Sequence, residues 1–200
     1  MSVLTELYEE IANCQDCELA KHRTKVVPGE GPEDAELLFI GEAPGWYEDQ
    51  QGRPFVGPAG AFLNQLLSSI GLSREQVYIA NVIKCRPPGN RDPLPAEIQA
   101  CRKWLDRQIE IMQPRIIITL GRYSLARYFP NESISKVHGK ARKEGKVVCY
   151  PMYHPAAALH QGSLRQIIEA DMLKIPEILQ QAESMAEAPA AVQQLRLTLD

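Results

Sequence analysis

The chain has 200 residues, of which 44% are hydrophobic and 24% charged, and its formal net charge at pH 7 is −3. These proportions are typical of a soluble globular protein with one domain and a sizeable core. The small negative charge argues against a chain-wide attraction to nucleic acid, so any such partner must contact a local basic patch.

No apolar run approaches the length of a membrane span, and the first residues lack the basic start and apolar stretch of a signal peptide. We therefore expect a cytoplasmic protein with no membrane partner. In that compartment the five cysteines are expected to include metal ligands or core thiols, because structural disulfides are rare there.

The first half of the chain predicts two helices and two strands. Apolar residues at helical spacing predict a helix over residues 4–12. An apolar run without helical period predicts a strand over 36–40, buried on both faces and ended by Gly41. The polar segment 46–57 has no periodicity and is expected to be a loop. A helix over 59–70 and a β-rich run over 77–83 follow.

The second half continues this alternation and ends in a tail. The expected elements are a basic, proline-rich loop over 84–93, a helix over 95–112, a strand over 116–120, a short helix over 123–128, an irregular basic segment over 134–145, a strand over 147–153, and a helix over 163–181 that bends or restarts near Pro176. Four strands separated by helices predict an α/β fold of three αβα layers, with a four-stranded parallel sheet at the centre. We expect one domain over 1–181 and a flexible tail over 182–200.

Four of the cysteines form a candidate metal site. Cys14 and Cys17 make a C-x-x-C pair, Cys85 lies in the stiff proline-rich loop, and Cys101 lies on the helix after it. Both zinc and a [4Fe–4S] cluster accept four thiolates, and spacing alone does not choose between them. The alternative is that Cys85 and Cys101 are core thiols and only a redox pair remains. Cys149 lies within a predicted strand and is interpreted as a small core residue.

Three polar residues are predicted to meet at one edge of the sheet. Glu42 follows the first strand, Asn81 lies late in the second, and His154 follows the fourth. The carboxyl ends of parallel strands share one edge, where α/β folds bind ligands. An amide can recognise a planar heterocycle, an imidazole can stabilise an oxyanion or donate a proton, and Phe55 could stack on a ring. Each residue taken singly could equally be structural.

Two basic segments adjoin this predicted edge. In the first, Lys84, Arg86 and Arg91 flank the prolines. The second contains Lys136, His138, Lys140, Arg142, Lys143 and Lys146. Such runs are usually solvated surface, but beside a binding site they suit phosphate contacts that hold a nucleic-acid strand.

Four segments are each a weak signal of a protein family, but their combination is specific. They are Gly41-Glu42-Ala43-Pro44-Gly45, the loop around Phe55, Asn81 ahead of Lys84-Cys85-Arg86-Pro87-Pro88-Gly89-Asn90-Arg91, and Tyr153-His154-Pro155-Ala156-Ala157. With the four cysteines, they resemble family 4 uracil-DNA glycosylases over nearly the whole domain. The resemblance implies a uracil-DNA glycosylase fold. It also implies a structural [4Fe–4S] cluster, not zinc, on Cys14, Cys17, Cys85 and Cys101.

The resemblance further implies a reaction, the hydrolysis of the N-glycosidic bond of a flipped-out uracil in DNA. The products are free uracil and an abasic site, as in base excision repair of deaminated cytosine. The substrate would be uracil-containing DNA, single- or double-stranded, and we expect the protein to be a monomer.

Site roles follow from the same resemblance. The implied uracil-binding residues are Gly41, Glu42, Ala43, Phe55, Asn81 and His154. Of these, Phe55 would stack on the base, Asn81 would bind the uracil edge and reject cytosine, and His154 would lie beside O2. The predicted catalytic residues are His154, which stabilises the developing uracil anion, and Glu42 or Asn90, which positions the water. Glu48 is a candidate for excluding the thymine methyl group.

Two positions depart from the related patterns. Ala43 stands where related glycosylase families place a water-positioning aspartate, which makes Glu42 and Asn90 the remaining candidates. His138 lies in the second basic segment, and a related subgroup uses a loop histidine to trap the sugar covalently. The sequence therefore leaves two alternatives to the hydrolase: a covalent uracil-DNA trap, and a non-catalytic DNA-binding module with a zinc site.

Overall fold

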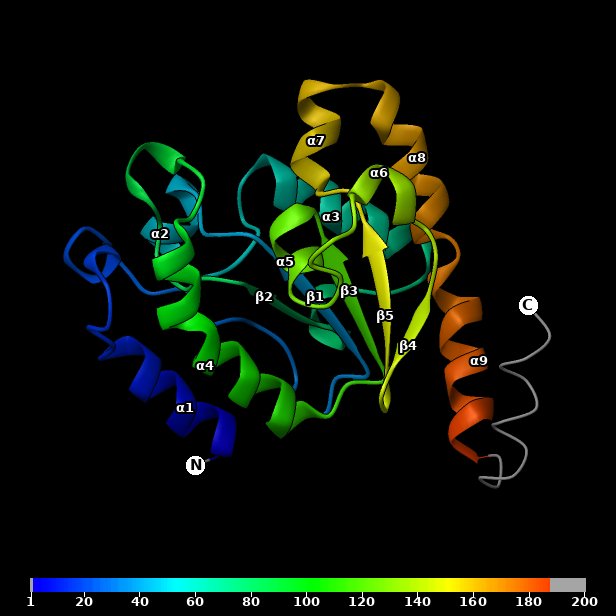
Figure 1. The fold of residues 1–200 in the computed structure, drawn as a ribbon, viewed down its shortest axis with the longest axis horizontal. Coiled ribbons are helices and arrows are strands. Elements are labelled where there is room, and N and C mark those ends of the chain that lie inside the picture. Colours follow the sequence, from blue (N-terminus) through cyan, green and yellow to red (C-terminus); the bar gives the residue numbers. More distant parts are fainter. Residues whose placement is uncertain (1, 188–200) are drawn as a thin grey trace.

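A five-stranded sheet runs through the centre of the protein, in the order β2-β1-β3-β5-β4 within the described chain (Figure 1). The computed structural model describes residues 2–187. The parallel strands are β1 (Leu37–Gly41), β2 (Tyr78–Asn81), β3 (Ile116–Leu120) and β5 (Val147–Met152). These are the four predicted strands, and the αβα fold class is confirmed.

The fifth strand corrects the predicted strand count. β4 (Arg142–Glu144) pairs antiparallel with β5 at the edge of the sheet. β4 lies in the segment that we expected to be irregular. Its three residues are all charged, so they show no alternation of apolar and polar side chains that would indicate a strand. The hairpin forms because Gly145 adopts a left-handed turn, with φ of 64°.

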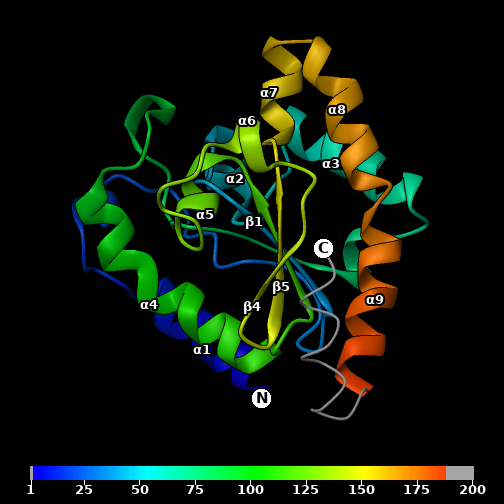
Figure 2. The ribbon, with the colours of Figure 1, turned by 45° about the vertical axis from the view of Figure 1, so that its right-hand side comes forward.

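Helices cover both faces of the sheet (Figure 2). Successive side chains of β1 pack on opposite faces. Leu38 and Ile40 pack in one core with residues of α1, α4 and α5, whereas Leu37 and Phe39 pack in the other with residues of α3, α8 and α9. The helices are α1 (Val3–Ala12), α2 (Trp46–Gln51), α3 (Pro58–Ser69), α4 (Pro95–Met112), α5 (Arg122–Ala126), α6 (Ile134–Val137), α7 (Pro155–His160), α8 (Ser163–Met172) and α9 (Ile175–Glu187).

Most predicted helices lie where the sequence placed them, and three short ones are new. The predicted loop over 46–57 contains α2, which begins where the Gly45 N–H donates to Glu48 Oε2 at 3.1 Å. α6 lies in the segment expected to be irregular, and α7 follows Pro155, a residue suited to a first helical turn. Short helices of this kind are too brief to show apolar periodicity.

The C-terminal helix restarts near Pro176, as predicted, because α8 and α9 are separate helices. α9 continues to Glu187, past the predicted domain end at residue 181. The rest of the predicted tail, residues 188–200, lies outside the described residues. None of the described helices is long and apolar enough to cross a membrane.

Candidate active site and cysteine pocket

A pocket of about 360 Å³ opens at the carboxyl edge of the sheet, within the usual size range of small-molecule sites. It is formed by the turn after β1, by α2, by the Phe55 loop and the start of α3, by the end of β2 and the loop that follows it, and by the segment from His154 into α7. The residues that line it are Ala43, Gly45, Trp46, Tyr47, Glu48, Phe55, Gly57, Pro58, Ala59, Asn81, Asn90, His154, Ala156, Leu159 and His160. The predicted convergence of the sheet edge therefore holds for Asn81 and His154.

Asn81 presents a polar group that lacks a partner. The residue ends β2, is 2% exposed, and lines the pocket. Its Oδ1 is buried and accepts no hydrogen bond from any described residue. A buried acceptor without a donor costs about 1–3 kcal/mol, so this oxygen is suited to a ligand that brings an N–H. Gly41 pairs with Asn81 in the sheet, and a side chain there would overlap Oδ1 and the Phe55 ring.

Phe55 is held in an uncommon backbone conformation. Its φ is 51°, a left-handed value that is unfavourable for an aromatic residue. Arg74 stabilises the turn, since its guanidinium donates to the carbonyl oxygens of Pro54 at 2.6 Å and Phe55 at 2.9 Å. The ring lies nearly parallel to His154, with centroids 5.4 Å apart. The loop thus fixes one aromatic face beside the imidazole.

We predict that Gly60→Ala disrupts this loop. A Cβ on Gly60 would overlap the carbonyl of Phe55, which is backbone and cannot rotate away. Overpacking of this kind costs roughly 1–3 kcal/mol, so the thermal midpoint should fall by several degrees. Gly162→Ala is the matched control, because nothing lies within 4 Å of a Cβ at that position. Equal midpoints for the two variants in differential scanning calorimetry would contradict the prediction.

His154 is neutral at physiological pH and has a defined tautomer. Burial lowers its pKa to about 4, although the nearby Glu48 carboxylate opposes the shift. The Ala156 N–H donates to His154 Nδ1 at 3.1 Å. Since Nδ1 accepts a hydrogen bond, the proton of the neutral ring lies on Nε2. His154 can therefore donate one N–H bond from Nε2 without carrying a charge.

The lowered pKa of His154 predicts a stability change at acid pH. In the unfolded chain a histidine has a pKa of about 6.5, so between that value and about 4 only the unfolded state binds the proton. The free energy of unfolding should therefore fall as pH decreases through this range, by on the order of 2–3 kcal/mol. Urea unfolding at pH 7 and pH 4.5 tests this, with His154→Gln as reference. An equal loss in both proteins would refute the assignment.

Glu42 and Asn90, the two candidates for positioning water, lie in different surroundings. Asn90 lines the pocket, and its Oδ1 accepts from Arg86 Nε at 2.6 Å. Glu42 does not line the pocket, although it directly follows β1. Burial and the nearby Asp92 raise the pKa of the Glu42 carboxyl, while Arg122 opposes this. The structure therefore brings Asn90, but not Glu42, into the same pocket as His154.

Glu48 has a clear structural task. Its carboxylate accepts from the backbone N–H groups of Gly45 at 3.1 Å, and of Val56 and Gly57 at 2.9 Å each. These bonds tie the turn after β1 to the Phe55 loop. Glu48 also lines the pocket, so its predicted role toward the thymine methyl group stays a prediction.

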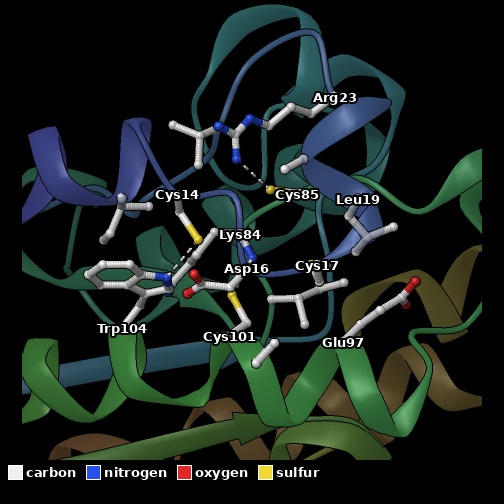
Figure 3. Close-up of a pocket in the computed structure, with 15 residues that line it drawn as sticks. Cys14, Asp16, Cys17, Leu19, Arg23, Lys84, Cys85, Glu97, Cys101 and Trp104 are labelled. Carbon is white, nitrogen blue, oxygen red and sulfur yellow. Dashed lines mark hydrogen bonds between the residues drawn. The ribbon is translucent and has the colours of Figure 1, made fainter.

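The four predicted cysteine ligands line a second pocket, between α1, α4 and the loop that follows β2 (Figure 3). Three of the sulfurs accept N–H hydrogen bonds. Arg23 Nη1 donates to Cys85 at 3.2 Å, the Lys84 N–H to Cys101 at 3.3 Å, and Trp104 Nε1 to Cys14 at 3.4 Å. Donors directed at sulfur are suited to thiolate ligands.

The same cysteines are not arranged around a single ion. No three Cys, His, Asp or Glu side chains in the described part of the chain lie close enough to bind one metal ion. Sulfurs around one zinc must converge on a point about 2.3 Å from each, whereas a four-iron cluster lets each thiolate bind a different iron. Four thiolates are a donor set that fits a [4Fe–4S] cluster and that zinc also accepts. Cys149 is fully buried in β5, as predicted.

Lys84 corrects the predicted phosphate contacts. We expected its ammonium on the surface of the basic loop, but the residue is 1% exposed. Its Nζ donates to the carbonyl oxygen of Asn81 at 2.9 Å and to Gln108 Oε1 at 2.7 Å. Arg91 is likewise engaged, in a bidentate pair with Glu97. The sequence signal that was missed is that Lys84 directly follows the apolar pair Val82-Ile83.

His138 lies outside the pocket that holds His154. Its Nδ1 lies 2.6 Å from Asp171 Oδ2, and its ring packs 4.9 Å from that of Tyr153. Asp171 is buried and also accepts from Lys174 at 3.0 Å. These contacts make His138 part of the support of the basic segment and give the covalent-trap alternative no support.

Two exposed aromatic residues on the pocket rim were missed. Trp46 and Tyr47 are 51% and 50% exposed and pack edge to face, with centroids 5.1 Å apart. Both belong to α2, which was expected to be a loop. Their adjacency to Pro44-Gly45 in the sequence is the signal that could have found them.

Comparisons with known proteins agree with this geometry. Residues 28–174 match the family model described as the uracil DNA glycosylase superfamily. The chain is 50% identical over 188 residues to the type-4 uracil-DNA glycosylase of Sulfurisphaera tokodaii, covering 89% of this chain and 86% of that protein. It is 49% identical to the type-4 enzyme of Saccharolobus solfataricus (90% and 88% covered) and 47% identical to that of Archaeoglobus fulgidus (89% and 94% covered). The chain therefore belongs to the uracil-DNA glycosylase superfamily and, within it, to the type-4 uracil-DNA glycosylases.

Proposed function

We propose that this protein is a DNA repair hydrolase that removes uracil from DNA and leaves an abasic site. It would thereby start the base excision repair of deaminated cytosine. Its membership of the type-4 family supports this function. The observation that carries the proposal is the buried, unpartnered Oδ1 of Asn81 in a pocket that also holds Phe55 and His154.

Uracil matches the hydrogen-bonding groups of Asn81. Uracil has an N–H donor at N3 and an acceptor at O4, so Asn81 Oδ1 accepts from N3 and Asn81 Nδ2 donates to O4. Cytosine carries the opposite pair at these positions and would leave two buried groups unpaired. The flipped base stacks on the Phe55 ring, beside Gly41 and Ala43.

His154 supplies the stabilisation of the leaving group. As the bond between uracil N1 and deoxyribose C1′ breaks, the electron pair goes to uracil and the sugar becomes cationic. The neutral His154 donates from Nε2 to uracil O2, where negative charge develops. Water then attacks C1′, its hydroxyl stays on the sugar, and its proton finally neutralises the uracil anion.

The positioning of water is assigned to Glu42 or Asn90. Asn90 lies in the pocket, whereas Glu42 is the stronger acceptor and its carboxyl pKa is raised by burial and Asp92. A side chain that accepts from the water orients its lone pair toward C1′. Uracil release by Glu42→Gln and Asn90→Ala, measured under single-turnover conditions, distinguishes the two roles.

We propose that Cys14, Cys17, Cys85 and Cys101 hold a [4Fe–4S] cluster. The N–H groups of Arg23, Trp104 and Lys84 that donate to three of the sulfurs support this ligand set. Burial raises the pKa of the Cys101 thiol to about 12, so binding iron would require the loss of this proton. When bound, the cluster would cross-link the segment after α1, helix α4 and the proline-rich loop, and hydrolysis would need no electron from it.

Cys101→Ala should cost the protein its iron and much of its stability. We expect a colourless protein whose thermal midpoint is lower by roughly 10 °C or more, since three segments lose a shared cross-link. Cys149→Ala is the control, because Cys149 is buried in the sheet and lies outside the cysteine pocket. Iron analysis and visible absorption measure the result. A Cys101→Ala protein with full iron content would rule out Cys101 as a ligand.

The substrate in this proposal is uracil-containing DNA, in single or double strands. The protein would bind it as a monomer, with a catalytic domain over residues 1–181, in the cytoplasm. The proposal is tested with oligonucleotides that carry one uracil, cytosine or thymine at the same position. After incubation, alkali should cleave only the uracil strand, at the abasic site. Intact uracil strands after incubation with iron-loaded protein would overturn the proposed function.

A further inference from the structure

At the outer edge of the sheet, the carbonyl of Asn81 has no neighbouring strand among the described residues to pair with. β2 is an edge strand, and the outward N–H and C=O of Ile79 are paired with Glu30 at 2.8 and 2.9 Å. In a parallel strand the outward direction recurs every second residue. Asn81 therefore points its own carbonyl outward, where a buried acceptor needs a donor.

Lys84 supplies that donor from three residues further along the chain. Its Nζ donates to Asn81 O at 2.9 Å and is itself fixed by Gln108 Oε1 at 2.7 Å. Gln108 is in turn held, because its Nε2 donates to Pro28 O and to Tyr78 OH, at 2.8 Å each. The ammonium thus donates the hydrogen bond to Asn81 O that a neighbouring strand would otherwise supply.

The backbone of Lys84 belongs to the wall of the cysteine pocket. Its N–H donates to Cys101 Sγ at 3.3 Å, and its carbonyl accepts from the Val27 N–H at 2.8 Å. Figure 3 shows Lys84 among the residues that line this pocket, together with Cys14 and Cys101. One residue therefore contacts both the cysteine pocket and the strand end that carries the Asn81 amide.

We propose that Lys84 is the positioning residue that fixes the Asn81 amide for uracil recognition and ties its position to the cysteine pocket. The inference rests on the proposed function of the Asn81 pocket. Lysine is almost never fully buried in proteins without a specific partner, and an apolar side chain would leave Asn81 O unpaired. Without the bond from Lys84 Nζ to Asn81 O, the backbone at the end of β2 loses the contact that would fix the direction of the Asn81 side chain.

The test variant is Lys84→Met, which keeps the length of the side chain and removes its donor. Because the ammonium bonds to Asn81 O and to Gln108 Oε1 are both lost, we expect inhibition by free uracil to weaken and single-turnover uracil release to slow, each about 10-fold or more. The KM for DNA should change little, since Lys84 is buried. Iron per chain should stay at the wild-type level, because the bond to Cys101 comes from the backbone.

Tyr78→Phe is the matched control. It removes a hydroxyl from the same buried network, which bonds Gln108 at 2.8 Å and Tyr8 at 2.5 Å, but leaves both bonds of the Lys84 ammonium. We expect a loss of stability with unchanged inhibition by uracil. A Lys84→Met protein with the wild-type inhibition constant would overturn the proposal. So would one that loses iron while its iron-loaded fraction binds uracil normally.

If Lys84→Met does not fold, Gln108→Met removes the acceptor that fixes Nζ, and it should weaken uracil inhibition in the same direction but less; wild-type inhibition there would overturn the proposal. Wild-type protein that releases no uracil would instead refute the proposed function. If the wild type is active and Lys84→Met is equally active, only the proposed role of Lys84 is refuted and the proposed function stands.

Discussion

Asn81→Asp is expected to lower uracil release by about 10³-fold or more and to create measurable release of cytosine. The carboxylate has no N–H for uracil O4, and it accepts from the cytosine N4 amino group. A site built to hydrogen-bond one substrate group rejects an analogue that lacks this group by about 10⁴-fold or more. A mismatch between the introduced aspartate and uracil is of the same kind, because the position is 2% exposed and water cannot replace the lost partner. Single-turnover release of each base from matched oligonucleotides measures both effects.

Asn81→Ala is the control for this exchange. It removes both the donor and the acceptor, so we expect slow uracil release with no gain on cytosine. Uracil release by Asn81→Asp within threefold of the wild-type rate would show that Asn81 does not recognise the base. Equal cytosine release by the two variants would show that the aspartate adds no recognition of its own.

His154→Ala is expected to slow uracil release by about 10²–10³-fold, which is the usual effect of removing one donor to a developing anion. The neutral imidazole donates from Nε2 because Nδ1 is occupied by the Ala156 N–H. The binding of uracil-containing DNA should change much less than the rate, because the bond to O2 strengthens as charge develops.

His160→Ala provides a control within the same pocket. His160 also lines the cavity but lies at its exposed rim, so its loss should slow release less than tenfold. Equal rate losses for the two histidine variants would remove the special role of His154. A wild-type rate for His154→Ala would exclude it from the mechanism.

The sequence was sufficient to predict that Asn81 and His154 converge, because topology fixes their positions, whereas Glu42, which was expected beside them, does not line the pocket. Once β1, β2 and β5 are parallel, Asn81 and His154 must lie at the same edge of the sheet. The buried strands can be recognised in the sequence as apolar runs. All four lie within two residues of their predicted bounds.

What the sequence could not give depends on contacts between distant segments. The burial of Lys84 requires Gln108, which lies 24 positions away. The conformation of Phe55 requires Arg74 and the small Gly60. The separation of Glu42 from the pocket depends on where its side chain points, and the pattern of the strand does not specify this. Local patterns predict elements, but these details arise from packing.

The most direct measurement is a crystal structure of the slow His154→Ala variant bound to an oligonucleotide with one uracil. We expect the uracil to lie out of the base stack and against the Phe55 ring, with its N3 and O4 facing the Asn81 amide. A uracil bound outside this pocket, or one that turns another edge toward Asn81, would contradict this expectation.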